Sequence, residues 1–121
     1  MANVFLFVEY PTCSTCRKAK KWLDAQGVEF VDRHIVDDAP TAKELRAWST
    51  LGNIPVRKLF NTSGKRYRER NIKDRLAAGM SDDEAFELLA QDGMLVKRPL
   101  LVGENVVFAG FREDQWREAL G

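Results

Sequence analysis

The chain has 121 residues, and its 19 lysines and arginines against 18 aspartates and glutamates give a net charge of +1. Hydrophobic residues make up 45% and charged residues 31%, a composition that predicts one globular domain and excludes collagen and intrinsic disorder. No apolar run approaches the roughly 20 residues of a membrane helix, and the near-neutral charge argues against direct nucleic-acid binding.

The cysteines restrict the possible chemistry further. The chain has two of them, Cys13 and Cys16, whereas a disulfide-stapled secreted fold would need four or more. A thiol-based four-ligand zinc site is also excluded, since His34 is the one histidine. No basic segment of the signal-peptide kind precedes the first apolar run. We therefore expect a cytoplasmic protein with redox chemistry, no metal and no bound cofactor.

The first third of the chain predicts a βαβ unit. An apolar strand over 3–9 is followed by a loop at Pro11, a helix over 14–26 that ends at Gly27, and a strand over 29–36. The two strands should be parallel with a right-handed connection. The inward-facing residues of the helix are predicted to be Ala19, Trp22, Leu23 and Gln26.

The middle of the chain predicts helices and its end predicts a hairpin and a helix. Thr41 and Glu44 form a capping box that begins a helix over 41–51, and Ser81 begins another over 81–91. Shorter helices are expected over 55–60 and 71–78, strands over 100–102 and 106–109, and a last helix over 112–120. The order predicts an α/β, thioredoxin-like domain over 1–121: βαβ, a helical insertion at about 41–91, then ββα, with a mixed four-stranded sheet.

The two cysteines lie where the first strand gives way to the first helix. Free N–H groups and the helix dipole at a helix N-terminus favour a thiolate at Cys13. Cys16 lies one turn further on and could resolve a mixed disulfide formed by Cys13. Two alternatives remain open, namely a pair of small buried residues and a metal site.

Further candidates are basic. Arg98 precedes Pro99 at the start of a strand, where thioredoxin-like folds place a cis proline opposite the dithiol; the alternative is a surface arginine. Residues 57–75 contain eight basic and two acidic residues, which could bind glutathione carboxylates, an oxyanion or an acidic partner. We favour a solvated face balanced by the acidic residues 82–84. We expect a structural or surface role for His34 and core positions for the tryptophans Trp22, Trp48 and Trp116.

Four segments resemble the ArsC family, which includes glutaredoxin-linked arsenate reductases and Spx-type regulators. They are the segment 10–19 around Cys13, the segment 55–64, the segment 97–102 around Arg98, and the ending at 110–114. By this resemblance Cys13 matches the nucleophile, Arg98 the neighbouring arginine and Pro99 the cis proline. The family's reductases carry two further anion-binding arginines, whose positions fall near Asn61 and Gly110 here.

The resemblance implies two functions. The first is a thiol–disulfide oxidoreductase, arsenate reductase-like, that acts on a small thiol or oxyanion substrate and is reset by glutathione, glutaredoxin or thioredoxin. Its catalytic residues would be Cys13, Cys16 and Arg98, and its substrate-binding residues Thr12, Ser14, Thr15, Arg17 and Pro99. The alternative is an Spx-like, redox-switched regulator that binds the C-terminal domain of the RNA polymerase α subunit.

Overall fold

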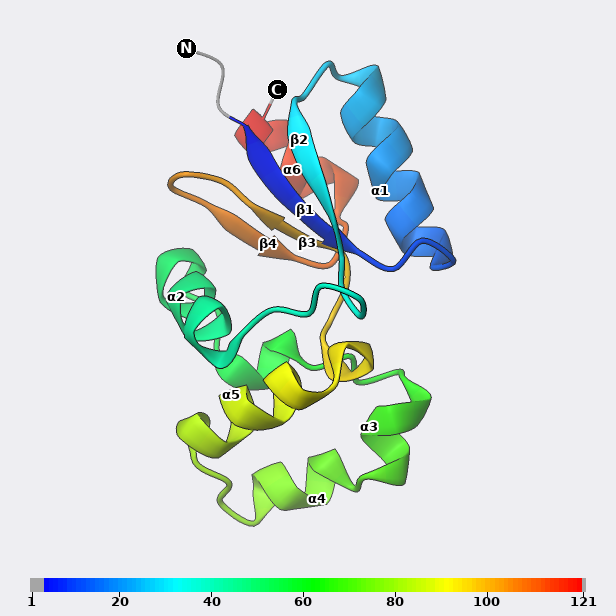
Figure 1. Cartoon of the computed structure of the whole chain (residues 1–121). Helices are drawn as coiled ribbons and strands as arrows, with labels where there is room; N and C mark the ends of the chain where they lie inside the picture. Colours follow the sequence, from blue (N-terminus) through cyan, green and yellow to red (C-terminus); the bar gives the residue numbers. More distant parts are fainter. Residues whose placement is uncertain (1–3, 121) are drawn as a thin grey trace.

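The computed structural model describes residues 4–120 and contains a four-stranded mixed sheet in the order β2-β1-β3-β4 (Figure 1). Strand β1 (Phe5–Glu9) is parallel to β2 (Phe30–His34) and antiparallel to β3 (Leu100–Val102), which is antiparallel to β4 (Val107–Ala109). The predicted βαβ and ββα units and the mixed sheet are confirmed. The predicted first strand includes residue 3, which lies outside the described residues.

One face of the sheet is covered by α1 (Ser14–Ala25) and α6 (Glu113–Leu120). Alternate residues of a strand face the same side, so Phe7 of β1 and Leu101 of β3 pack with Trp22 and Trp116. The core role predicted for the tryptophans is confirmed, since Trp48 is also buried. The inward position predicted for Gln26 is wrong, because α1 ends at Ala25 and Gln26 is exposed.

The opposite face of the sheet packs against the helices that connect β2 to β3. Val8 and Leu100 point into a second core, which Leu45, Trp48 and Leu89 help to form. In Figure 1 these helices gather at one end of the sheet. They are α2 (Ala42–Gly52), the 3-10 turn η1 (Val56–Leu59), α3 (Lys65–Glu69), α4 (Ile72–Ala77), α5 (Asp82–Gln91) and the 3-10 turn η2 (Gly93–Leu95).

Two of these elements, α3 and η2, are absent from the sequence-based prediction. The five residues of α3 are all polar or aromatic and carry no side-chain cap, so no periodic pattern marks it. The ion pair between Arg66 Nη1 and Asp92 Oδ2, at 2.6 Å, joins α3 to η2, whose Met94 N–H donates to the same Asp92 side chain. A Cβ at Gly93 would overlap the carbonyl oxygen of Ile35, so a glycine is needed for η2 to approach the sheet.

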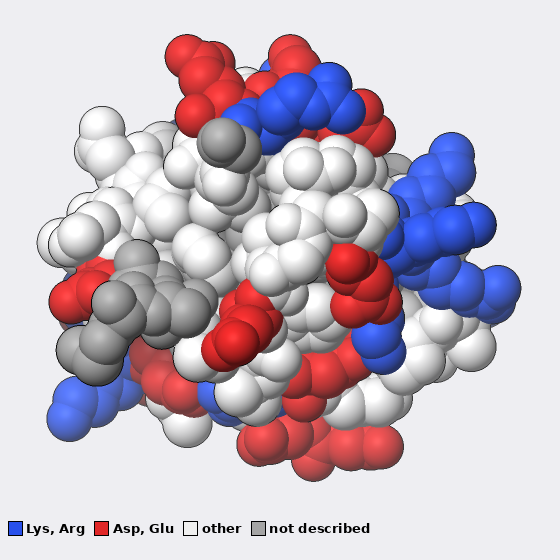
Figure 2. All heavy atoms as spheres, turned by 90° about the horizontal axis from the view of Figure 1, so that it is seen from above, with Lys and Arg blue, Asp and Glu red and all other residues white. Residues whose placement is uncertain are grey.

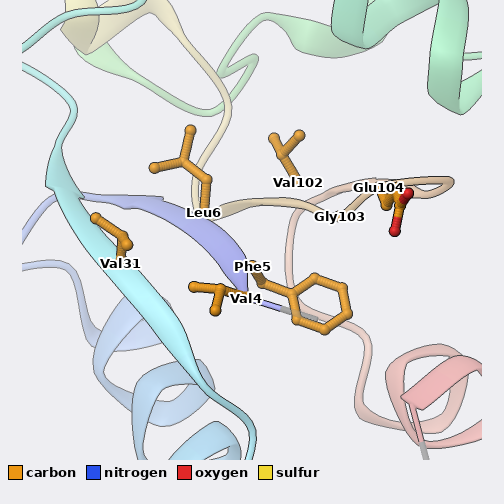
Figure 3. Close-up of a pocket in the computed structure, with 7 residues that line it drawn as sticks. All are labelled: Val4, Phe5, Leu6, Val31, Val102, Gly103 and Glu104. Atoms are coloured by element: carbon orange, nitrogen blue, oxygen red, sulfur yellow. The ribbon is translucent and has the colours of Figure 1, made fainter. Parts of the chain in front are cut away.

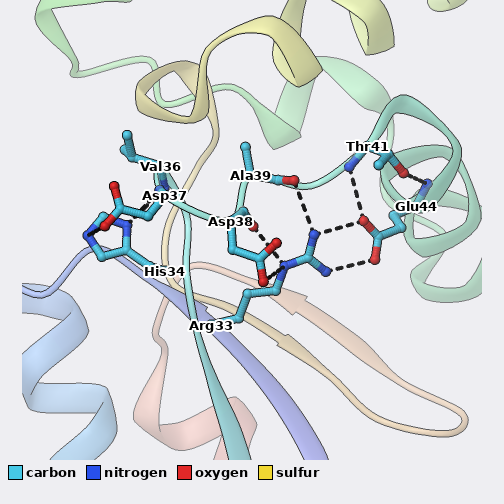
Figure 4. Close-up of polar contacts among 8 residues, drawn as sticks. All are labelled: Arg33, His34, Val36, Asp37, Asp38, Ala39, Thr41 and Glu44. Carbon is cyan, nitrogen blue, oxygen red and sulfur yellow. Dashed lines mark hydrogen bonds and ion pairs between the residues drawn. The ribbon is translucent and has the colours of Figure 1, made fainter.

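An arginine of the sheet pairs with a glutamate of the helical segment (Figure 4). Arg33 of β2 donates from Nη1 to Glu44 Oε2 at 2.7 Å and from Nη2 to Glu44 Oε1 at 2.9 Å. Glu44 also completes the predicted capping box with Thr41 at the start of α2. His34, next in the strand, has the structural role expected of it, because its Nδ1 accepts hydrogen bonds from the N–H groups of Val36 and Asp37.

The Arg33–Glu44 contact predicts a pH-dependent contribution to stability. Hydrogen bonding to Arg33 lowers the Glu44 pKa from 4.5 to about 2. The carboxylate therefore stabilises the fold above about pH 4.5, and this contribution is lost as the pH falls through about 2. We expect Glu44→Gln to lower the free energy of unfolding by about 1 kcal/mol at neutral pH, allowing for solvent screening of this partly exposed group.

Urea unfolding of both proteins between pH 2 and 7 measures this effect. The difference between them should narrow as the pH falls from 4.5 towards 2. The matched control is Glu87→Gln, an exposed carboxylate on α5, which should change stability little at any pH. A difference of equal size at every pH would contradict the ion-pair explanation.

Candidate active site

The first cysteine of the motif lies at the start of α1. Cys13 is the N-cap, its N–H donates to the Tyr10 carbonyl at 2.9 Å, and its own carbonyl accepts from Arg17 N–H at 3.0 Å. These bonds fold the loop after β1 into a turn that leaves Cys13 half-buried. Cys16, one turn along, has no exposed surface. The pair thus presents one accessible sulfur with a second sulfur beneath the surface.

Arg98 reaches the same end of the sheet from the other direction. Val8 of β1 faces Leu100 of the antiparallel β3, so the residues just before β3 lie beside those just after β1. The Arg98–Pro99 peptide bond is cis, as the resemblance implies. The guanidinium carbon of Arg98 lies 5.3 Å from the ring centre of Tyr10, and Nη1 donates to the Met94 carbonyl at 3.3 Å. Arg98 is therefore held over the loop that carries Cys13.

The surroundings shift the pKa values of the two thiols in opposite directions. Burial by itself would raise the pKa of Cys13, but hydrogen bonds from the Cys16 backbone and thiol, the Thr15 N–H and the Arg98 guanidinium together lower it. For Cys16, burial raises the pKa to about 12, and the negative charge of Cys13 adds to that effect. Cys13 is the thiol poised to ionise, and Cys16 remains protonated while Cys13 is a thiolate.

A cavity of about 1180 Å³ opens next to Cys13. Among the described residues that line it there is no aspartate or glutamate. Its basic lining residues come from η1, α4 and the segments flanking β3 and β4: Arg57, Lys58, Lys73, Lys97, Arg98 and Arg112. Apolar and aromatic side chains such as Phe60, Tyr67 and Phe111 form the remainder of the wall. This combination suits an anionic ligand with an organic portion.

The candidate residues from the sequence divide into two groups. Cys13, Thr15 and Arg98 line the cavity. Cys16 is buried beneath the surface and is not part of the described lining. Thr12, on the loop before α1, and Ser14, the first residue of α1, are both exposed, and neither lines the cavity. Arg17 and Pro99 are not part of the described lining either. Arg17 folds back on the loop, where its Nε donates to the Pro11 carbonyl at 3.2 Å. Pro99 is buried behind Arg98.

The eight basic residues of the stretch 57–75 are all exposed, which confirms the predicted solvated face, but the predicted balance by residues 82–84 is wrong. Arg57, Lys58 and Lys73 line the cavity. Arg66 and Arg70 both pair with Asp92, while Asp83 pairs with Arg46, which lies outside the stretch. The predicted charge balance is wrong because the partner of a surface charge depends on tertiary placement, which a count of charges along the chain does not show.

Lys97 is a cavity residue that the sequence analysis did not single out, although it precedes Arg98 directly. A Cβ at Gly110 would lie 2.8 Å from Lys97 Cε, so the side chain of Lys97 occupies the space that opens at Gly110. Gly110 has a φ of +87° and donates its N–H to the Pro99 carbonyl at 2.8 Å. Gly110 and Asn61, the two positions that the resemblance assigns to further anion-binding arginines, both line the cavity. Lys97 supplies a positive charge next to Gly110.

A smaller cavity of about 390 Å³ lies at the other end of the sheet. Its lining is apolar apart from Glu104 (Figure 3), and the lining residues are Val4, Phe5, Leu6, Val31, Val102, Gly103 and Glu104. Seen from that end, the molecule has acidic and basic side chains around a largely uncharged surface (Figure 2). Its described lining includes no cysteine and no cluster of cations, so it does not offer the chemistry found beside Cys13.

Two other kinds of site are not found in residues 4–120. No group of three or more His, Cys, Asp or Glu side chains in that range is arranged to hold a metal ion. None of the described helices is long and apolar enough to cross a membrane.

Comparison with known proteins identifies the family. The model of the ArsC family matches residues 8–119, which include the whole cysteine motif, Arg98 and most of α6. The chain belongs to the ArsC family. It is 50% identical to the uncharacterized protein YusI of Bacillus subtilis, over 93% of this chain and 94% of that protein.

Other members of the ArsC family that resemble the chain include regulators. The regulatory protein MgsR of Bacillus subtilis is 31% identical over 95% of this chain and 89% of its own length. The global transcriptional regulator Spx of Streptococcus pneumoniae is 32% identical over 91% of this chain and 80% of its own length. Proteins named as regulators are thus similar to this chain over most of its length.

Solved structures of ArsC proteins superpose on almost the whole chain. An ArsC family related protein from Bacteroides fragilis gives a TM-score of 0.90 at 49% identity, over 94% of this chain and 95% of that one. A possible arsenate reductase from Streptococcus mutans gives 0.83 at 42% identity, over 93% and 97%. These likenesses confirm the thioredoxin-like α/β fold expected from the sequence.

The acidity of Cys13 can be measured from the pH dependence of its alkylation. We expect iodoacetamide to label Cys13 with a pKa below that of an ordinary thiol, because helix N–H groups and Arg98 stabilise the thiolate. Arg98→Met should raise this pKa and slow labelling at neutral pH. Lys21→Met, which removes an exposed charge from the same helix, should leave both unchanged. An ordinary thiol pKa in the unmodified protein would contradict the assignment.

Proposed function

We propose that this ArsC-family protein is a thiol–disulfide oxidoreductase that uses Cys13 and Cys16 as a self-contained dithiol. The observation that carries this proposal is the placement of a half-buried thiol of lowered pKa at the start of α1, directly above a fully buried thiol. The first can attack a substrate disulfide, and the second lies where it can displace the product.

The reaction would proceed in two exchanges. The Cys13 thiolate attacks one sulfur of a disulfide, and the other sulfur leaves as a thiolate. Cys16 then attacks Cys13, a Cys13–Cys16 disulfide forms, and the second half of the substrate leaves as a thiol. The substrate is reduced by two electrons and the dithiol is oxidised, after which glutathione, glutaredoxin or thioredoxin would reduce the protein again.

The cavity supports an anionic thiol compound as the substrate. Glutathione carries carboxylates that the cations around Cys13 would bind, and its peptide portion would contact the apolar wall. Arg98 would hold charge next to the reacting sulfur, with Thr15 beside it. A more specific form of this proposal is that the substrate is an arsenic oxyanion. It is supported by the name of the Streptococcus mutans relative, a possible arsenate reductase.

Turnover assays with glutathione mixed disulfides and with arsenate test the proposal. We expect a glutathione mixed disulfide to be reduced by the reduced protein without added glutathione or glutaredoxin, in one turnover per dithiol. Cys13→Ser should abolish this reduction, and Cys16→Ser should trap a Cys13–glutathione adduct that intact-mass spectrometry detects. Arsenate turnover above the Cys13→Ser control would add the oxyanion to the substrates. No turnover of either substrate and no trapped adduct would refute the oxidoreductase.

A second candidate is the redox-switched regulator, which the identity to MgsR and Spx supports. Here the Cys13–Cys16 pair would control docking on the C-terminal domain of the RNA polymerase α subunit. A pull-down with that domain, using reduced and oxidised protein, tests this function. Binding that changes with the redox state and disappears in Cys13→Ser would support the regulator, and no binding in either state would exclude it.

A further inference from the structure

The cavity beside Cys13 holds more positive charge than glutathione would neutralise. Its six basic lining residues are Arg57, Lys58, Lys73, Lys97, Arg98 and Arg112, and its described lining includes no acid. Glutathione brings two carboxylates and one ammonium group, so its net charge offsets a small part of this excess. Like charges gathered in one concave site repel one another unless an anion neutralises them. The excess therefore points to a ligand of higher negative charge.

The six cations of the cavity have no acidic partner within residues 4–120. The ion pairs in that range use other basic side chains. Arg66 and Arg70, which flank the cavity residue Tyr67 in the sequence, both pair with Asp92, whereas Lys73 of the next helix does not. The protein thus neutralises the cations that lie outside the cavity and leaves those inside it for a ligand.

The cavity is also large for a tripeptide. Its volume of about 1180 Å³ exceeds the roughly 300–1,000 Å³ of pockets that hold drug-sized molecules. The lining extends from Cys13 and Thr15 at the start of α1 to Lys73 and Leu76 of α4. Figure 1 shows α4 at the end of the helical segment that is remote from the sheet. A ligand that fills this space has its reacting sulfur at Cys13 and extends towards α4.

Two aromatic rings of the wall can hold a planar group. Tyr67 of α3 and Phe111 both line the cavity and are partly exposed. Each packs against a buried ring, with centres 6.1 Å apart for Tyr67 and Phe60 and 4.8 Å apart for Phe111 and Trp116. A ring held in this way can stack on a nucleobase at little cost in side-chain entropy. A concave site of cations and aromatic rings suits a small organic polyanion rather than the surface of a protein partner.

We propose that the site reduces disulfides of a phosphorylated thiol that carries a nucleobase, the chemical class of coenzyme A. This inference rests on the proposed dithiol function and names its substrate class. A phosphate monoester carries a charge of about −1.5 to −2 at pH 7, and a diphosphate adds to it, so such a ligand matches the unpaired cations more closely than glutathione does. An aromatic ring of the wall would hold the base, and the thiol arm would reach Cys13.

The two exchanges balance with such a disulfide. The Cys13 thiolate bonds to one sulfur of coenzyme A disulfide, and the electron pair of the broken S–S bond leaves with the other sulfur as a thiolate. Cys16 then loses its proton to solvent and bonds to Cys13, and the second coenzyme A leaves as a thiolate. The disulfide gains the two electrons that the dithiol loses, so a single turnover needs no other reductant.

Single-turnover kinetics of the reduced protein test this substrate class. The probes are coenzyme A disulfide, glutathione disulfide and hydroxyethyl disulfide, which is small and uncharged, each normalised to its rate with dithiothreitol. We expect the normalised second-order rate constant for coenzyme A disulfide to exceed that for glutathione disulfide at least about tenfold, the effect of one further charged hydrogen bond. Phosphopantetheine disulfide, which lacks the nucleotide, should react more slowly than coenzyme A disulfide.

Two basic residues of α4 provide a matched pair of variants. Lys73 and Arg75 are both exposed, but Lys73 lines the cavity and Arg75 is not part of its described lining. Lys73→Met should lower the ratio of the rate constants for coenzyme A disulfide and hydroxyethyl disulfide by about tenfold. Arg75→Met should leave this ratio unchanged. A partly unfolded variant would lose both rates in proportion, so the ratio separates ligand binding from stability.

The outcomes distinguish this inference from the proposed function. Equal normalised rate constants for coenzyme A disulfide and glutathione disulfide would overturn the phosphorylated substrate and leave the dithiol intact. Equal ratios in Lys73→Met and Arg75→Met would do the same. If the unmodified protein reduced none of the disulfides, hydroxyethyl disulfide included, the dithiol mechanism and its substrate class would both be overturned.

Discussion

The site depends on the register in which Val8 of β1 faces Leu100 of β3. In an antiparallel pair the end of one strand lies beside the beginning of the other. Cys13 follows β1 by four residues and Arg98 precedes β3 by two, so this pairing brings them together although 85 positions separate them in the sequence. A shift of one residue would turn Val8 and Leu100 away from the helical core and would separate the guanidinium from the thiol.

The helical segment between β2 and β3 supplies the cavity wall, and backbone contacts hold it in place. Asn61 N–H donates to the Leu95 carbonyl and Lys97 N–H to the Leu59 carbonyl, each at 2.7 Å, so the residues after η1 are joined to those just before Arg98. At the other side, Arg33 fixes α2 to β2 through Glu44. The helical segment is therefore held by contacts on two sides, neither of which involves a cysteine.

Sequence reasoning found the features that local patterns encode. The apolar runs, the capping box at Thr41 and the cysteine spacing predicted the strands, α2 and the position of Cys13, and the resemblance carried Arg98 and Pro99. The cavity lining from Lys58 to Lys73 could not be predicted, because it depends on how short helices pack against one another. The burial of Glu9 could not be predicted either, because an acid at the end of an apolar strand usually lies at the surface. Only the position of α1 shows that this side chain is buried.

The contact between Gly110 and Lys97 has a consequence for how this site could be changed. One pocket of space beside Cys13 is reached from two chain segments, one entering β3 and one leaving β4, and it holds a single long side chain. A side chain at position 110 would have to displace Lys97 and adopt a φ of +87°, a conformation that residues other than glycine rarely take. The site therefore takes its cation from the segment that enters β3, and the glycine on the segment that leaves β4 keeps the space open for it.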